Sequence, residues 1–90
     1  MYKIRYSEQA KEDLVRLKRG EPKAFEKAKK FLAELMIHPY IGTGHPEPLK
    51  GNRSGQWSRV ITKKHRLVYE VYDDEVFVLI ISAYGHYGDK

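Results

Sequence analysis

Cysteine is absent from the 90-residue sequence, so no disulfide can stabilise the fold and no thiolate can act as a nucleophile. Long apolar runs are missing too, because the longest, Val76 to Ile81, is far shorter than the ~20 residues of a membrane-spanning helix. The first six residues alternate between apolar and polar, unlike a signal peptide. We find no internal repeat. We therefore expect one soluble, cytoplasmic domain spanning residues 1–90.

Acidic residues are scarce in one stretch, residues 45–66. It holds six Lys/Arg and a single acid, Glu47, so its formal charge is 6 − 1 = +5. The remaining chain has 17 − 6 = 11 bases and 12 − 1 = 11 acids, which cancel. The whole net charge of +5 thus lies around one carboxylate, which favours binding to a polyanion such as nucleic acid. An anionic membrane surface or an acidic protein is a weaker alternative.

Two of the four prolines of the sequence flank Glu47. His45 and Glu47 each precede a proline, which pushes both toward extended backbone conformations. The prolines themselves have a fixed φ. Glu47 is therefore presented on a stiff, extended segment. The alternative is a rigid connector that carries an incidental solvent-exposed glutamate.

The remaining pattern predicts an α+β fold with the order β-α-α-β-β-β. Residues 2–6 alternate like a strand, Ser7 is a good N-cap, and a first helix runs from there to Gly20. A second helix starts at Pro22 and ends at His38-Pro39. Its expected apolar stripe is Phe25, Ala28, Leu32, Leu35 and Met36. Residues 38–55 are predicted as loop, followed by strands at 57–62, 65–72 and 76–83. We expect the helical hairpin to pack on a small antiparallel sheet.

If Lys63 and Lys64 form a two-residue turn, Thr62 faces His65 and Arg59 faces Val68. Arg59 and Arg66 then lie on one sheet face as diagonal neighbours, roughly 7–8 Å apart. Two converging guanidinium groups suit a phosphate. Trp57 shares this predicted face. The alternative is a solvated strand face with a surface tryptophan.

Metal-independent RNA cleavage needs a base for the 2′-hydroxyl, an acid for the leaving 5′-oxygen, and cations for the phosphate. The candidate base is Glu47 and the candidate acid is His86, beside Tyr87, which we expect to stack on a base or orient the phosphate. The candidate phosphate ligands are Lys50, Arg59 and Arg66. We expect no metal or cofactor, because the four histidines show no paired ligand spacing. His38 and His65 are interpreted as structural, and His45 as a loop residue that could approach the phosphate.

Several motifs resemble the YoeB/Txe branch of the RelE toxin superfamily. They are residues 44–50 (GHPEPLK), Ser54-Gly55, Trp57-Ser58-Arg59, residues 65–69 (HRLVY) and His86-Tyr87. The resemblance implies the toxin of a type II toxin–antitoxin pair, a ribosome-dependent endoribonuclease that cleaves mRNA in the A site. It assigns Glu47 as base, Arg66 as the transition-state arginine, His86 as acid and Tyr87 as the functional tyrosine. Lys50 and Arg59 match phosphate-binding positions.

The resemblance also implies partners: mRNA, the ribosome, an acidic YefM-like antitoxin, and operator DNA only through that antitoxin. A homodimer is left open. Gly85 departs from the family pattern and should loosen the placement of His86, and the tail 88–90 is longer than usual. The competing hypothesis is a non-catalytic RNA- or ribosome-binding module or an antitoxin-bound corepressor. Such a module has no need of both Glu47 and His86.

Overall fold

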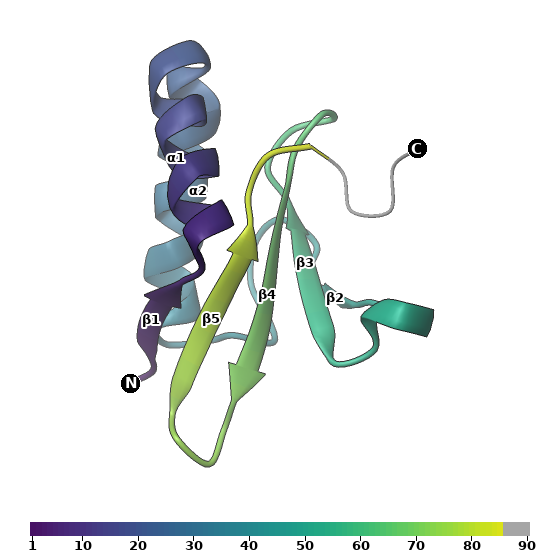
Figure 1. The fold of residues 1–90 in the computed structure, drawn as a ribbon. Coiled ribbons are helices and arrows are strands. Elements are labelled where there is room, and N and C mark those ends of the chain that lie inside the picture. The colour runs from purple at the N-terminus through teal and green to yellow at the C-terminus, as the bar shows by residue number, and fades with distance from the viewer. Residues whose placement is uncertain (86–90) are drawn as a thin grey trace.

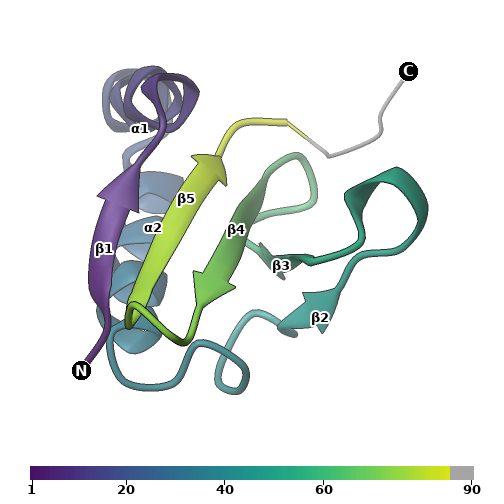
Figure 2. The ribbon, with the colours of Figure 1, turned by 60° about the horizontal axis from the view of Figure 1, so that its bottom comes forward.

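The computed structural model describes residues 1–85, which form two helices and a five-stranded sheet. The chain runs through β1 (Lys3–Tyr6), α1 (Glu8–Gly20), α2 (Pro22–Leu35), β2 (Glu47–Pro48), a short 3-10 helix (Gly51–Arg53), β3 (Gln56–Val60), β4 (Arg66–Tyr72) and β5 (Phe77–Ser82). Both helices pack on one side of the sheet (Figures 1 and 2). The predicted α+β class is therefore confirmed, and a single sheet face remains without a helix.

The helix boundaries follow the capping signals in the sequence. The Ser7 side chain accepts the N–H of Ala10 at 3.0 Å, and Glu8 places a negative charge in the first turn of α1. Glu21 is the single residue between the helices, and α2 begins at Pro22, as predicted. α2 then returns along α1 (Figure 1). It ends at Leu35, slightly before the predicted end at His38.

The sheet order is β1-β5-β4-β3-β2, and it is mixed rather than antiparallel. β2, β3, β4 and β5 pair antiparallel, but β1 runs parallel to β5. Alternation within residues 2–6 predicts a strand but contains no information about its partner, which lies more than 70 residues away. β2 was predicted as loop, because two residues that include a proline give no strand pattern. Pro48 is tolerated there because β2 is an edge strand.

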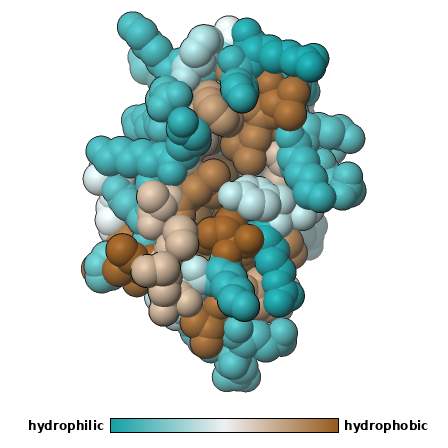
Figure 3. Space-filling model, turned by 90° about the vertical axis from the view of Figure 1, so that its left-hand side faces the viewer, coloured by the Kyte–Doolittle hydropathy of each residue, from teal (hydrophilic) through white to brown (hydrophobic). Residues whose placement is uncertain are grey.

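The core lies between the helices and the sheet. It is built by the fully buried side chains of Leu17, Ala28, Phe31, Leu35, Leu67, Tyr69, Val78 and Ile80. The predicted stripe on α2 is partly wrong, because Phe31 belongs to the core whereas Phe25 and Leu32 are only partly buried. Phe25 and Leu32 instead line an apolar groove along α1, α2 and β1, with Lys3, Lys18 and Lys29 at its sides (Figure 3). Within residues 1–85, the helices are too short or too polar to span a bilayer.

Candidate active site around Glu47 and Arg66

The β3–β4 turn decides which side chains share a face of the sheet. The backbone N–H groups of Ile61 and Thr62 both donate to the carbonyl of His65, at 3.0 and 3.1 Å. Two residues on one strand therefore oppose one residue on the other, which is a β-bulge. The predicted pairing of Thr62 with His65 is confirmed, but the extra residue shifts the strands beyond it by one position. Arg59 pairs with Leu67 rather than Val68, and Arg66 pairs with Val60.

Because one residue of shift reverses every side chain, Arg59 and Arg66 lie on opposite faces of the sheet, and the predicted diagonal pair is wrong. Arg59 points into the core and is 0% exposed. Its guanidinium donates to the Tyr69 hydroxyl (3.2 Å), to Glu34 Oε1 (2.7 Å), and to the carbonyls of His38 (2.8 Å), Ile41 (2.9 Å) and Thr43 (3.4 Å). Arg59 therefore binds the loop after α2, and the buried guanidinium has no surface to offer a phosphate.

Glu34 and Arg59 form one buried network with this loop. Burial alone would raise the pKa of Glu34, but hydrogen bonds from Thr43 and the charge of Arg59 outweigh it and lower that pKa below its ordinary value. Glu34 therefore stays ionised beside Arg59. In the sequence Glu34 reads as part of the polar face of α2, so nothing local marks it as the partner of a strand arginine.

The same loop fixes the backbone that leads to Glu47. The Gly44 carbonyl accepts the N–H of Val60 at 2.7 Å, and Gly44 has φ +80° against the ring of Phe31. A Cβ at Gly44 would lie 2.5 Å from that ring, so only glycine fits. Three residues further on, Glu47 pairs with Ser58 of β3. Glu47 is therefore held on the face of the sheet opposite the helices, here called the open face.

Glu47 and Arg66 meet on the open face from two different strands. Arg66 Nη1 lies 3.9 Å from Glu47 Oε1, and the two side chains are 24% and 54% exposed. This separation is beyond hydrogen-bond range, so the two groups are adjacent without saturating one another. Ser58, the β3 partner of Glu47, is 0% exposed, and within residues 1–85 its hydroxyl has no hydrogen-bond partner. Sequence reasoning did not single out this buried donor beside Glu47.

The other predicted site residues are placed less uniformly. Lys50 is exposed, three residues after Glu47. Trp57 lies on the face opposite Glu47, where its ring contacts Tyr40 edge-on at 5.1 Å, so it does not face Arg66. His86 and Tyr87 lie outside the described residues. The described chain ends at Gly85, whose carbonyl accepts the backbone N–H of Arg66 at 3.0 Å.

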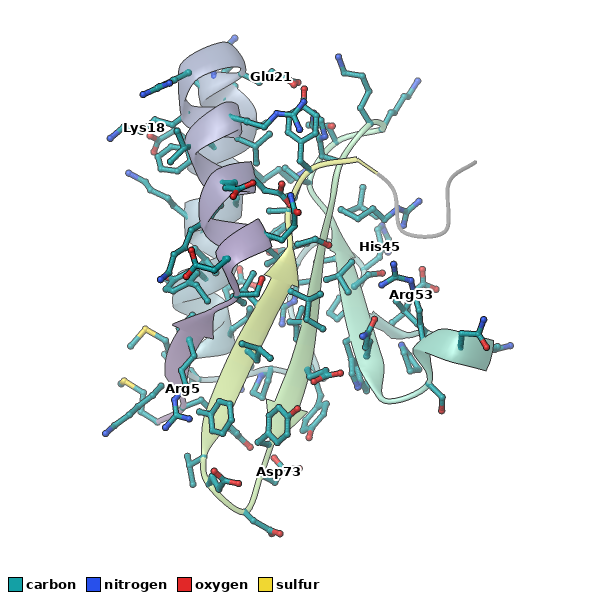
Figure 4. The ribbon with its side chains drawn as sticks, in the orientation of Figure 1. Arg5, Lys18, Glu21, His45, Arg53 and Asp73 are labelled. Atoms are coloured by element: carbon teal, nitrogen blue, oxygen red, sulfur yellow. The ribbon has the colours of Figure 1, made fainter. Side chains whose placement is uncertain are left out.

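The three other histidines follow their predicted roles in part. His65 is 2% exposed and structural, as expected, with Nε2 2.8 Å from a Glu21 carboxylate oxygen. His38 is exposed, and its carbonyl belongs to the Arg59 network. His45 is exposed on the β2 side of the molecule (Figure 4), and its φ of +53° differs from the extended backbone expected before a proline. Among residues 1–85 we find no group of three or more potential ligand side chains that could hold a metal ion.

A helical hairpin on a five-stranded mixed sheet is the fold that this chain shares with a class of small bacterial toxins. The YoeB/ParE toxin from Agrobacterium tumefaciens has a TM-score of 0.89 and 33% identity, covering 94% of this chain and 99% of that one. The YoeB dimer from Staphylococcus aureus has a TM-score of 0.84 and 36% identity, with coverage of 96% and 98%.

Sequence comparison narrows the class. The model of the YoeB-like toxin of bacterial type II toxin-antitoxin systems matches residues 6–87. Toxin YoeB from Escherichia coli (strain K12) is 39% identical over 85 residues, covering 94% of this chain and 99% of the relative. Toxin YoeB from Streptomyces coelicolor is 38% identical over the same length and coverage. The chain therefore belongs to the family of YoeB-like toxins of type II toxin–antitoxin systems.

Proposed function

We propose that this toxin is an endoribonuclease that cleaves mRNA in the ribosomal A site without a metal ion and thereby stops translation. The observation that carries the proposal is the meeting of Glu47 and Arg66 at 3.9 Å on the open face, where both side chains reach solvent. A carboxylate next to a guanidinium supplies a proton acceptor beside a fixed positive charge, as 2′-hydroxyl attack on a phosphate requires.

In the proposed reaction Glu47 removes the proton of the 2′-hydroxyl, whose oxygen attacks the adjacent phosphorus. The bond from phosphorus to the 5′-oxygen breaks, and His86 gives that oxygen a proton. The products are a 2′,3′-cyclic phosphate, which can open to a 3′-phosphate, and a 5′-hydroxyl. Arg66, whose guanidinium lies 3.9 Å from the Glu47 carboxylate, stabilises the negative charge that grows on the phosphate.

Of the four other predicted RNA contacts, two are retained and two are left out. Lys50 stays in the proposal as an exposed phosphate ligand close to Glu47 in the chain. Tyr87 stays on the family resemblance alone. Arg59 and Trp57 are left out, because Arg59 is buried and Trp57 lies on the other face of the sheet.

The ribosome supplies what the isolated chain lacks. Holding the 2′-hydroxyl in line with the scissile bond lowers the barrier by several kcal/mol in well-oriented systems. Glu47 is about half exposed, and we propose that the ribosome, more than the chain itself, holds RNA in that geometry. We therefore propose feeble cleavage of free RNA and strong cleavage of ribosome-bound mRNA.

We further propose that an acidic antitoxin neutralises this chain. A YoeB–YefM heterotetramer from Staphylococcus aureus, whose toxin chain is 35% identical over 97% of this one with a TM-score of 0.82, is a toxin–antitoxin complex. The lysine-edged apolar groove offers apolar anchors to an acidic segment (Figure 3). Operator DNA would be reached only through the antitoxin, and the Staphylococcus aureus YoeB dimer makes a homodimer of this chain a further proposal.

The test is single-turnover cleavage of mRNA on programmed ribosomes and of the same RNA free, with analysis of the product ends. We expect Glu47→Gln and Arg66→Met to lose at least about 10²-fold in rate, while Glu26→Gln, on the outer face of α2, cleaves like the wild type. Cleavage should survive chelation of divalent ions as far as the ribosome stays assembled. A 3′-hydroxyl product, or growth arrest undiminished by Glu47→Gln, would contradict the proposal, and the second result would favour a non-catalytic binding module.

A further inference from the structure

His65 is buried at the bulged β3–β4 turn, and both its ring nitrogens have partners. Nε2 lies 2.8 Å from Glu21 Oε2, and Nδ1 accepts the backbone N–H of Gly85 at 2.9 Å. Glu21 is the single residue between α1 and α2, so the imidazole joins the helical hairpin to the end of the described chain. Figure 4 shows Glu21 at this end of the molecule, above the sheet.

These contacts fix the tautomer of His65. A backbone amide can only donate, so Nδ1 must present a lone pair to Gly85, and the ring hydrogen is on Nε2. That hydrogen is donated to Glu21. The hydrogen bond from His65 lowers the pKa of Glu21, so this carboxylate remains an ionised acceptor. Glu21 thus orients the ring, and the ring orients Gly85.

Each of the three residues after β5 (83–85) contacts another part of the chain. Asp13 is 2% exposed, and its Oδ2 accepts the N–H of Ala83 at 2.9 Å. The Tyr84 ring lies 4.3 Å from the His65 ring and under the guanidinium of Arg16 at 3.8 Å. Gly85 uses both of its backbone groups, one to His65 Nδ1 and one to the N–H of Arg66.

The expectation that Gly85 loosens the placement of His86 concerns a residue outside the described ones, but Gly85 itself is held at both of its backbone groups. It adopts φ +79°, which a residue with a side chain rarely takes, and this conformation turns its N–H toward His65 and its carbonyl toward Arg66. Glycine is therefore what allows the double contact. The chain leaves Gly85 next to the backbone of the arginine in the proposed site.

We propose that His65, oriented by Glu21, is a positioning residue for RNA cleavage. It fixes Gly85 beside the backbone of Arg66, the arginine of the proposed site. This rests on the proposed function. His65 does not touch the substrate. The charged groups packed around it are Glu21, Lys64 at 4.0 Å from Glu21, and Arg16 on Tyr84. The role does not depend on a charge on the imidazole.

Two substitutions separate the two contacts. His65→Asn places an amide oxygen near the position of Nδ1, so it keeps an acceptor for Gly85 and gives up the donor to Glu21. His65→Gln reaches the position of Nε2, so it keeps the Glu21 contact and gives up the acceptor. Asn and Gln both place an amide where the buried imidazole ring was. The two variants should therefore lose similar amounts of unfolding free energy. Glu26→Gln serves as the remote control.

The experiment measures Gly85 amide hydrogen exchange by NMR and the kcat and KM of ribosomal mRNA cleavage. We expect His65→Gln to speed Gly85 exchange at least tenfold over His65→Asn, and to lower kcat by about 10²-fold with KM unchanged. His65→Asn should keep most of kcat. Faster Gly85 exchange in His65→Gln with unchanged kcat would overturn the positioning role, and so would equal losses of kcat in both variants that follow their losses of stability. Absence of cleavage by the wild-type chain would instead overturn the proposed function, and the role of His65 with it, whatever the exchange data show.

Discussion

Arg59 should stabilise the fold and not bind RNA, and Arg59→Met tests this directly. The substitution keeps a long apolar stem and removes the guanidinium from a fully buried position. It leaves the carbonyls of His38 and Ile41 without the donors they have at 2.8 and 2.9 Å, and Glu34 without its cation. Glu34 keeps its hydrogen bonds from Thr43, at 3.1 and 2.7 Å, so its carboxylate loses only part of its stabilisation.

The magnitude follows from those contacts. Each of the two short carbonyl bonds is worth about 1 kcal/mol net. Removing one partner of a fully buried ion pair costs about 3–5 kcal/mol, but the Glu34 side chain is 26% exposed and partly rehydrates, so we assign it about 1–2 kcal/mol. The expected loss is therefore about 3–4 kcal/mol of unfolding free energy. At about 4–8 °C per kcal/mol for a chain of this size, the Tm should fall by roughly 12–30 °C.

The assay is urea unfolding monitored by the fluorescence of Trp57, the one tryptophan of the sequence. Arg19→Met is the matched control, because Arg19 is exposed in the last turn of α1 and its loss should cost at most about 1 kcal/mol. If Arg59→Met unfolds at the same midpoint as Arg19→Met and loses RNA cleavage, the assignment of Arg59 to the loop network is wrong.

Four other measurements test the structure. Glu34 has a lowered pKa when folded, so its contribution to stability is present above the unfolded pKa near 4.5 and is lost as pH falls through the folded value; Glu34→Gln should flatten that acid limb in urea melts. Hydrogen bonding to Asp73 raises the pKa of Tyr40 to about 12, so stability should fall as pH rises from about 10 through 12, and less so in Tyr40→Phe. Gly44→Ala should cost about 2–4 kcal/mol through its clash with an aromatic ring of α2, whereas Gly20→Ala, which meets nothing within 4 Å, should cost little or stabilise. Association with an acidic antitoxin should slow with added salt, and hydrogen-exchange protection confined to the helices, with none at the open face, would contradict direct neutralisation of the site.

Local signals in the sequence were sufficient for most of the fold. Ser7, Gly20 and Pro22 act through backbone geometry within one turn of the chain, so the limits they predict for α1 and the start of α2 hold. The partner of β1 is different, because the parallel pairing with β5 depends on how the helical hairpin crosses the sheet. Alternation of side chains within a strand carries no record of that crossing.

In the candidate site, too, the position of a residue marked by local sequence could be predicted, whereas that of a residue that depends on strand register could not. Glu47 could be found because two prolines and a local excess of cations mark it in the sequence. Arg59 was misassigned because one hydrogen-bonded bulge, at Ile61 and Thr62, moves it from the surface to the core. Side chains on a strand alternate between the two faces of the sheet, so an arginine there faces either solvent or the core. A one-residue shift in register moves it from one face to the other. Once inside, the guanidinium is neutralised by Glu34 and satisfied by loop carbonyls, and that loop leads to Glu47. Arg59, whose position was predicted wrongly, thus still contributes to the site. It holds the segment that carries Glu47, the proposed base, and does not contact the phosphate.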